Sequence, residues 1–214
     1  NVINPDDIVQ EYGADTLRLY EMFMGDYTSD APWSTDSLRG CKRFIDKVIR
    51  LKDTIVPGEG YSKKQESLIH KTIKKVQNDL NTMAYNTAVS SLMILANSFD
   101  NAKGITKDEY HLLLTLLNPI APHITEELNE SLGFNPICES KWPKYDESKI
   151  VDTTITVVVQ INGKIRDKLE VAKDTPNEEV KAKALASSKV QEYLNNQEPK
   201  KVIVVPNKLV SIVI

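Results

Sequence analysis

Cysteine is scarce in this sequence: the chain has only two, Cys41 and Cys138, and they lie far apart. Two distant cysteines match neither a disulfide framework nor the closely spaced ligands of a structural zinc site. The sequence also lacks any run of about 18 apolar residues and any signal-peptide pattern, so it predicts neither a membrane span nor export. We therefore expect a protein of the reducing cytoplasm that makes no membrane contact.

The residue arrangements that usually mark catalysis are absent as well. Gly58 and Gly60 lack the spacing and the preceding strand of a phosphate-binding loop, and no Ser/His/Asp set is recognisable. His123 precedes Glu126 and Glu127 by three and four residues, but there is no second histidine nearby. Such a group is more typical of capping at the start of a helix than of a metal site. We expect no catalytic residue, cofactor or metal within this sequence.

The composition is that of an ordinary globular protein with one large or two small domains. The chain has 214 residues, of which 41% are hydrophobic and 27% charged. Its net charge of −3 does not indicate a nucleic-acid-binding protein. The charge is uneven, however: residues 1–150 carry 17 basic and 22 acidic groups, and residues 151–214 carry 10 and 8. The body is therefore acidic and the tail mildly basic.

The first 25 residues predict two short helices that meet at an angle. Asn4 is a helix cap, and Pro5 suits the first helical position because its missing N–H needs no partner there. Gly13 is expected to end this helix in the left-handed conformation. Asp15 begins the second helix, which stops at Gly25. The chain opens on Asn1 and not on Met, so we expect more protein to precede this elbow.

Apolar residues then recur every three to four positions over four longer stretches. These stretches run from Ser34 to about Thr54, from Ser62 to Met83, from Ala88 to Gly104, and from Thr106 to Leu117. Two capping boxes are expected, Ser62 with Gln65 and Thr106 with Glu109, and a further helix begins at Pro122. Short connections between such helices predict an antiparallel bundle.

Arg43 and Arg50 lie off the apolar side of the first bundle helix. Arginines in this position can contact an RNA backbone. A solvated helix face is the simpler interpretation.

From about residue 150 the pattern changes to strands. Residues 154–161 are rich in β-branched side chains, and Asn162-Gly163 is typical of a type I′ hairpin turn. Two helices beginning near Thr175 and Ser188 follow, and then strands over residues 201–205 and 209–214. The order β-β-α-α-β-β predicts a small, separate α+β domain.

The return strand of this hairpin alternates between apolar and basic residues. Ile165, Leu169 and Val171 are expected on one face. Lys164, Arg166 and Lys168 are expected on the other, about 7 Å apart, which is near the spacing of phosphates along one nucleic-acid strand. The alternative is that these residues protect an edge strand from pairing with other chains.

Two segments of the helical part resemble the class I aminoacyl-tRNA synthetases. Ala14-Asp15-Thr16-Leu17-Arg18 resembles the family's Ala-Asp-Ala-Leu-Arg signature, with Thr16 in place of Ala, in the elbow that follows the Lys-Met-Ser-Lys-Ser loop. Residues 118–132, NPIAPHITEELNESL, resemble a hallmark near the end of the anticodon-binding bundle of leucyl and related enzymes, with Asn129 in place of a common Trp.

The tail narrows the resemblance to the bacterial leucyl enzymes. VVVQINGKIRDKLEV and KKVIVVPNKLVSIVI are similar to their C-terminal domain, whereas valyl enzymes end in a coiled coil and many isoleucyl enzymes in a zinc module. The resemblance covers essentially the whole chain. It implies a mostly α-helical fold, an antiparallel bundle followed by a small α+β domain. The implied segments are an elbow and linker over residues 1–33, a helical-bundle anticodon-binding domain over 34–149 and a tRNA-binding domain over 150–214.

The resemblance also implies a function. The parent enzyme would attach leucine to tRNA-Leu using ATP and Mg, with its catalytic and editing domains before Asn1. This portion would position tRNA by its shape and would be inactive alone. The implied partners are tRNA-Leu and the other domains of the same enzyme, in a cytoplasmic monomer. The candidate RNA contacts are Lys164, Arg166, Lys168, Arg43, Arg50 and Arg18. Two alternatives stay open: another class I synthetase (valyl, isoleucyl or methionyl), or a non-enzymatic helical scaffold that binds protein.

Overall fold

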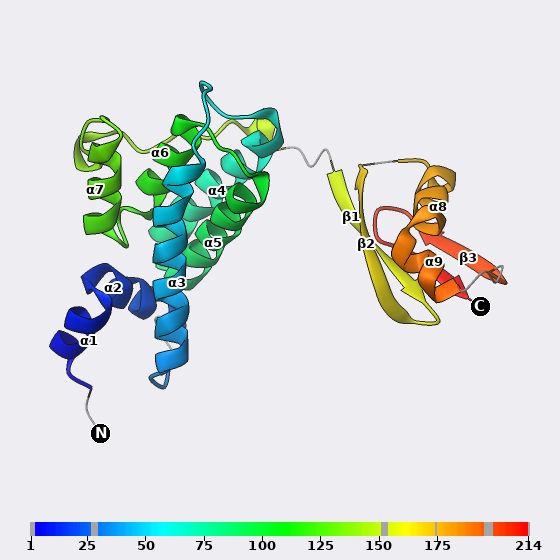
Figure 1. The fold of residues 1–214 in the computed structure, drawn as a ribbon, viewed down its shortest axis with the longest axis horizontal. Helices are drawn as coiled ribbons and strands as arrows, with labels where there is room; N and C mark the ends of the chain where they lie inside the picture. Colours follow the sequence, from blue (N-terminus) through cyan, green and yellow to red (C-terminus); the bar gives the residue numbers. More distant parts are fainter. Residues whose placement is uncertain (1–2, 27–29, 151–153, 174, 195–198, 214) are drawn as a thin grey trace. The chain divides into compact units, whose positions relative to one another are not determined.

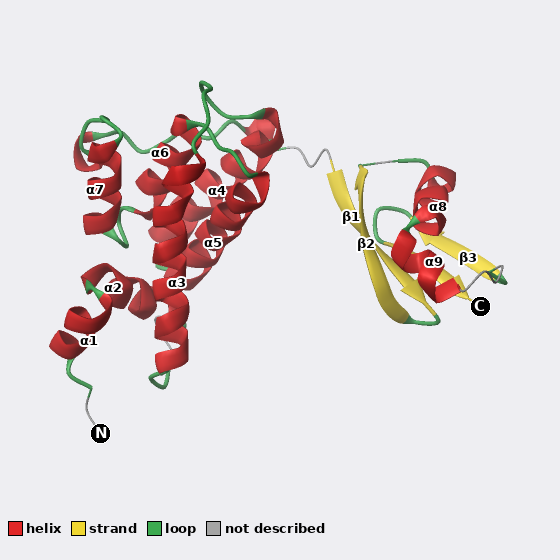
Figure 2. Cartoon of the chain, in the orientation of Figure 1, coloured by secondary structure: helices red, strands yellow, loops and turns green. Residues whose placement is uncertain are grey.

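The computed structural model describes residues 3–26, 30–150, 154–173, 175–194 and 199–213. The chain forms two compact units, Asn1–Ile150 and Val151–Ile214 (Figure 1). In their described parts the first unit is helical and the second combines strands with helices (Figure 2). Asn1, Val2 and Ile214, which the sequence places in the elbow and the last strand, lie outside the described residues. In the described ranges no helix has the length and apolar character needed to cross a bilayer.

The first unit contains the elbow, the predicted bundle and the helix that begins at Pro122. Its α-helices are α1 Pro5–Tyr12, α2 Ala14–Phe23, α3 Thr35–Leu51, α4 Lys63–Asn81, α5 Tyr85–Ala102, α6 Lys107–Leu117 and α7 Pro122–Ser131. The unit also has three short 3-10 helices in its described residues, η1 Lys52–Thr54 directly after α3, and η2 Ile137–Glu139 and η3 Glu147–Lys149 after α7. The mostly helical fold expected from the sequence is confirmed.

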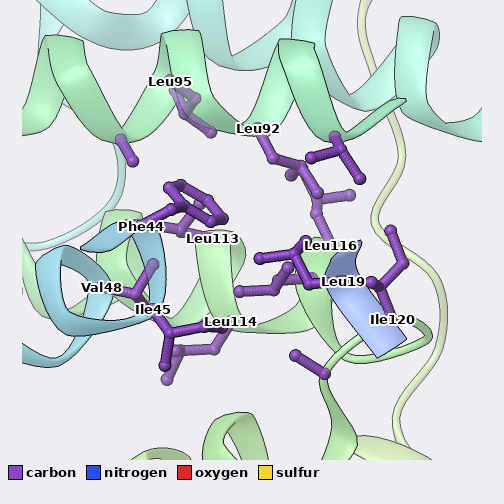
Figure 3. Close-up of a cluster of buried hydrophobic side chains, with 14 of the residues drawn as sticks. Leu19, Phe44, Ile45, Val48, Leu92, Leu95, Leu113, Leu114, Leu116 and Ile120 are labelled. Carbon is purple, nitrogen blue, oxygen red and sulfur yellow. The ribbon is translucent and has the colours of Figure 1, made fainter. Parts of the chain in front are cut away.

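Helix α6 lies in the middle of the core. Its residues 112–117 are all buried, as expected for a helix that is apolar on nearly every side. Figure 3 shows Leu113, Leu114 and Leu116 of α6 within a cluster of side chains drawn from several helices. The other labelled members are Leu19, Phe44, Ile45, Val48, Leu92, Leu95 and Ile120. Because Leu19 belongs to α2, the elbow shares one hydrophobic core with the bundle.

The local signals at helix starts are partly confirmed. The Asn4 side chain accepts the Asp6 N–H at 3.2 Å, and the predicted capping box of Thr106 and Glu109 is complete. Gly13 has a positive φ of 91°, but its ψ of 149° lies outside the expected left-handed helical region. This backbone conformation is essentially restricted to glycine. Gly13 therefore allows the sharp change of direction between α1 and α2.

The capping box predicted at the start of α4 is wrong. Ser62 makes no side-chain cap; its hydroxyl donates to Glu109 Oε1 at 2.7 Å instead. Gln65 is buried and exchanges hydrogen bonds with Ser98 of α5. Glu109 of α6 and Ser98 of α5 take the place of the expected pairing between Ser62 and Gln65. These hydrogen bonds connect the start of α4 to two other helices.

The second unit is a four-stranded sheet with two helices on one face. Its elements are β1 Thr154–Ile161, β2 Lys164–Ala172, α8 Asn177–Ala186, α9 Ser188–Leu194, β3 Lys201–Val205 and β4 Leu209–Val213. The strand order is β2-β1-β4-β3, with β1 and β4 parallel and the other pairs antiparallel. Asn162 and Gly163 both have positive φ, 46° and 78°, as the predicted type I′ turn requires. Side chains of α8 and α9 pack on β1 and β4 to form the core of this unit.

The last segment of the first unit is fixed against α4. His70 of α4 is 6% exposed, and its Nδ1 accepts the Asp146 N–H at 3.2 Å. Its Nε2 is buried and has no hydrogen-bond partner among the described residues. Two ion pairs flank this bond, Glu66–Lys149 and Lys74–Glu147, each with 2.6 Å between nitrogen and oxygen. A neutral His70 is therefore the form that holds this segment in place.

We expect the stability of the first unit to fall as the pH is lowered below 6.5, the ordinary pKa of histidine. Burial, and then the positive charge of Lys149, lower the pKa of His70, although Glu66 and Asp146 act in the opposite direction. Below pH 6.5, His70 is therefore protonated more readily in the unfolded chain than in the folded one. This difference in proton binding favours unfolding.

Urea unfolding at pH 7.5 and pH 5.5 measures this effect. Unchanged protein should lose more stability between the two pH values than a His70→Gln variant, in which all other titrating groups remain. Equal losses in both proteins would contradict the prediction.

Candidate nucleic-acid interface

Two sequence motifs separated by 108 residues meet at the start of α7. Asp15 of α2 is 8% exposed, and its Oδ2 accepts the Ile124 N–H at 2.7 Å. Its Oδ1 lies 2.8 Å from His123 Nδ1. Helix α7 has no side-chain cap of its own at Ala121. Asp15 therefore supplies, from α2, the negative charge and the acceptor that the first turn of a helix needs.

Arg18 completes the joint between α2 and the bundle. Its Nε donates to the carbonyl of Ile120 at 2.9 Å and its Nη2 to that of Pro119 at 3.1 Å. Both carbonyls lie just past the end of α6. Two of the five N–H donors of this candidate RNA contact are thus used inside the unit. Its observed contacts are those of a residue that positions the elbow.

The metal site considered at His123 is not formed in the described residues. The partner of His123 is Asp15, and the carboxylate of Glu126 accepts the backbone N–H groups of Ile137 and Cys138, each at 2.9 Å. Across the described ranges, no three His, Cys, Asp or Glu side chains are grouped so that they could hold a metal ion. The expected local capping by Glu126 and Glu127 is wrong, because neither acid caps α7: its first-turn N–H donates to Asp15 of α2.

A groove of about 500 Å³ lies between α3 and α5 and contains both candidate arginines of the bundle. Its lining residues are Gly40, Arg43, Phe44, Asp46, Lys47, Arg50, Met93 and Asn97. Arg43 and Arg50 are exposed, and neither has an ion-pair partner in the described part of the chain. Lys47 already has partners inside the unit, since its Nζ lies 2.5 Å from Asn97 Oδ1 and 3.5 Å from Asp100.

Helix α3 places Arg43 and Arg50 on the same side. Arg43 and Arg50 are two helical turns apart, which is about 10 Å. Gly40 lies one turn before Arg43, and a Cβ there would meet nothing closer than Arg43 Nη2 at 3.9 Å. Packing does not require a glycine at this position, although glycine within a helix costs about 0.5–1 kcal/mol relative to alanine. The groove therefore offers two guanidinium groups that have no ion-pair partner among the described residues, beside the bare backbone of Gly40.

The strand that carries the other basic candidates has an irregularity that the sequence did not reveal. Val159 of β1 lies opposite Asp167, but the next residue, Gln160, lies opposite Ile165. Arg166 is therefore the extra residue of a β-bulge, which reverses the alternation of the residues before it. The prediction that Ile165 shares a face with Val171 is wrong: Ile165 is 58% exposed and Val171 is 2% exposed.

The bulge also separates the three predicted basic contacts. Lys168 lies opposite Val158 and shares its face, which is the one away from the helices. Lys164 lies opposite Ile161, a member of the core beneath α8 and α9. The expected single row of three basic residues is therefore wrong, because the alternation changes between its ends.

Arg166 makes a contact that sequence reasoning missed. Its guanidinium carbon lies 4.0 Å from the ring centroid of Tyr193 in α9, and its Nη1 donates to the Tyr193 hydroxyl at 3.1 Å. Arg166 therefore lies on the helix-bearing face of the sheet with Lys164. No pattern in the sequence links Arg166 with Tyr193; only the bulge and the course of α9 bring them together.

Known proteins resemble this chain over its whole length. The profile of the family described as the anticodon-binding domain of tRNA ligase matches residues 63–182, which is more than half of the chain. The chain is 45% identical to the leucine--tRNA ligase of Alkaliphilus oremlandii (strain OhILAs) and 44% identical to that of Borrelia hermsii (strain HS1 / DAH). All of the chain is matched, but it covers only 27% and 26% of these relatives, or about a quarter of their length.

A solved structure agrees with these matches. The ternary complex of Agrobacterium radiobacter K84 agnB2 LeuRS-tRNA-LeuAMS contains a chain with a TM-score of 0.64 and 26% sequence identity. The match covers 100% of this chain and 30% of that one.

Proposed function

Since this chain belongs to the family of the anticodon-binding domain of tRNA ligases, we propose that it is the tRNA-binding portion of a leucine--tRNA ligase. Leucine--tRNA ligases match it from end to end at 43–45% identity, which supports the choice of leucine over other amino acids. The tRNA in the complex of the similar LeuRS supports RNA as the partner.

The whole enzyme would activate leucine with ATP and Mg and transfer it to tRNA-Leu. We assign those steps to the remainder of the enzyme, since this chain corresponds to about a quarter of its relatives. The partners are tRNA-Leu and that remainder, within a monomeric cytoplasmic protein. The role of this portion is to hold tRNA in the position that the chemistry requires.

The observation that carries the RNA-binding role is the groove along α3. Guanidinium groups bind phosphate oxygens in a bidentate manner and stay charged at every physiological pH. Arg43 and Arg50 line this groove without an ion-pair partner in the described part of the chain, and the acid beside them, Asp46, already pairs with Lys42. The first unit is acidic overall, so a locally basic groove is a specific feature of its surface. Such a groove suits recognition of RNA by its backbone and shape.

The second unit would provide additional contacts through Lys164, Arg166 and Lys168. Because the bulge divides them between two faces, they would engage separate parts of the RNA and not successive phosphates of one strand. We rest no part of this role on Arg18, whose contacts are to carbonyls of the bundle.

The proposal is tested by titrating the chain against tRNA-Leu and a non-cognate tRNA at 0.1 M and 0.5 M salt. We expect tighter binding to tRNA-Leu and a clear weakening at the higher salt, because phosphate contacts release counterions. Equal affinity for both tRNAs would argue against the leucine assignment, and absence of binding at 0.1 M salt would overturn the RNA-binding role. Leucine-dependent exchange between ATP and pyrophosphate by the chain alone would overturn the assignment of catalysis to the remainder.

A further inference from the structure

Tyr193 is the only aromatic residue between residues 151 and 214, and it lies at the surface. It belongs to α9, whose buried residues Val190 and Leu194 already fill the core of the second unit. Tyr193 is 49% exposed. The fold therefore leaves its single aromatic ring largely outside the hydrophobic core, although burial of such a ring would be strongly stabilising.

The ring is held in a fixed position by Arg166. The guanidinium carbon lies over the ring, 4.0 Å from its centroid, and Nη1 donates to the hydroxyl at 3.1 Å. Nε of Arg166 is buried and has no hydrogen-bond partner in the described residues. The bulge produces this arrangement, since it makes Arg166 the unpaired extra residue of β2. An arginine needed only for solubility at a strand edge would not require such a fixed partner.

Two exposed lysines lie close to this pair along the chain, in β2 and in α9. Lys164 precedes Arg166 by two residues and is exposed. The side chain of Lys189 is 68% exposed and lies 3.4 Å from Asp167. Two acids lie next to the pair in the chain: the carboxylate of Asp167 already accepts hydrogen bonds from Ser187 and Lys189, and Glu192, which precedes Tyr193, is exposed. Lys164 and Arg166 therefore provide positive charge for a negatively charged ligand at the exposed ring.

We propose that Tyr193 and Arg166 form a stacking platform for an unpaired or terminal base of the bound RNA. Proteins bind exposed bases by stacking them on aromatic rings and on arginine guanidinium planes, while neighbouring cations hold the phosphates. The exposed part of the pair would receive the base, and Lys164 and Lys189 would lie near its phosphates. This inference rests on the proposed RNA-binding function and specifies how the second unit contributes to it.

The test measures the affinity of the full chain for tRNA-Leu over a range of salt concentrations. Replacing Tyr193 with Ala or Leu should weaken binding about tenfold, the loss typical of one stacked base. The slope of log affinity against log salt should not change, because no charge is removed. Tyr193→Phe should retain most of the affinity, since the ring remains. Arg166→Lys keeps the charge but removes the plane, so it should also weaken binding without changing the slope.

The matched control is Ile203→Ala, which removes an exposed apolar side chain from the opposite face of the sheet. It should bind tRNA-Leu as the unchanged chain does. If Tyr193→Leu also binds normally, the stacking platform is wrong while the RNA-binding function stands, and Tyr193 is then free for a protein contact. If the unchanged chain does not bind RNA, both proposals fail. Circular dichroism shows whether each variant folds. If Tyr193→Ala does not fold, the comparison uses Tyr193→Leu.

Discussion

Replacing Asp15 with alanine is expected to destabilise the first unit by about 3 kcal/mol. The side chain is 9% exposed and accepts two hydrogen bonds across the joint between α2 and α7. Its loss removes the only side-chain cap of α7 in the described structure and leaves the Ile124 N–H without its acceptor. Loss of a helix cap typically costs about 1 kcal/mol, and bonds to a charged group cost more when one partner is removed.

Tryptophan fluorescence during urea unfolding measures this change selectively. Both tryptophans, Trp33 and Trp142, belong to the first unit, so the signal does not report on the second. Asp36→Ala is the matched control, because Asp36 is also an acid in the first turn of a helix but its side chain is 94% exposed. That variant should change the stability by less than about 0.5 kcal/mol. Equal stabilities for the two alanine variants would show that the joint contributes nothing.

A second variant separates the charge of Asp15 from its shape. Asp15→Asn keeps an oxygen that can accept the Ile124 N–H but loses the negative charge at the helix start. We expect a loss of about 1 kcal/mol, between the effects of Asp15→Ala and the exposed control. An Asn variant as unstable as the Ala variant would mean that the charge, and not the acceptor, is what the joint requires.

The helices and strands could be predicted because their signals are local. Asn4 caps its own helix, Thr106 and Glu109 pair within one turn, and Asn162-Gly163 determines its own hairpin. A period of three to four residues likewise depends only on neighbours along the chain. These features form in the fold even where a distant partner is present, since Glu109 keeps its capping bond with one carboxylate oxygen while the other accepts from Ser62.

The site could be predicted less well, since its geometry depends on partners far away in the sequence. Asp15 reads as an ordinary helix start, but its partners lie 108 and 109 residues away. Asn129 stands where the resembling motif commonly has Trp, and it is fully buried and bonds to His111 of α6 at 2.7 Å. Such residues satisfy buried polar groups of other elements, which no periodic pattern records.

The bulge in β2 shows a different limit. Strict alternation correctly places Leu169 and Val171 on the core face, but one extra residue at Arg166 reverses the assignment for Ile165. The segment contains no glycine or proline to mark the irregularity. Ile165 is as apolar as the core residues. Only the register of β1 against β2 therefore shows that Ile165 lies on the opposite face.

Replacing Arg43 and Arg50 together with glutamine is expected to weaken binding to tRNA-Leu about 50-fold at 0.1 M salt. Each phosphate contact contributes roughly 0.9 to the slope of log affinity against log salt, so two lost contacts should lower that slope by nearly 2. The same arithmetic predicts a loss of only about threefold at 0.5 M salt. Glutamine keeps the length and polarity of the side chain, and both positions are exposed, so the fold should not change.

The matched control is the pair Lys63→Gln and Lys64→Gln at the start of α4. Both lysines are exposed, and the double change removes the same charge from the same unit, outside the α3 groove. A general attraction between RNA and positive charge would make the two double variants equally weak. A contact in the groove instead predicts that only the arginine variant loses affinity and salt dependence. Normal binding by the Arg43 and Arg50 variant would remove the groove from the interface and leave the second unit as the principal RNA contact.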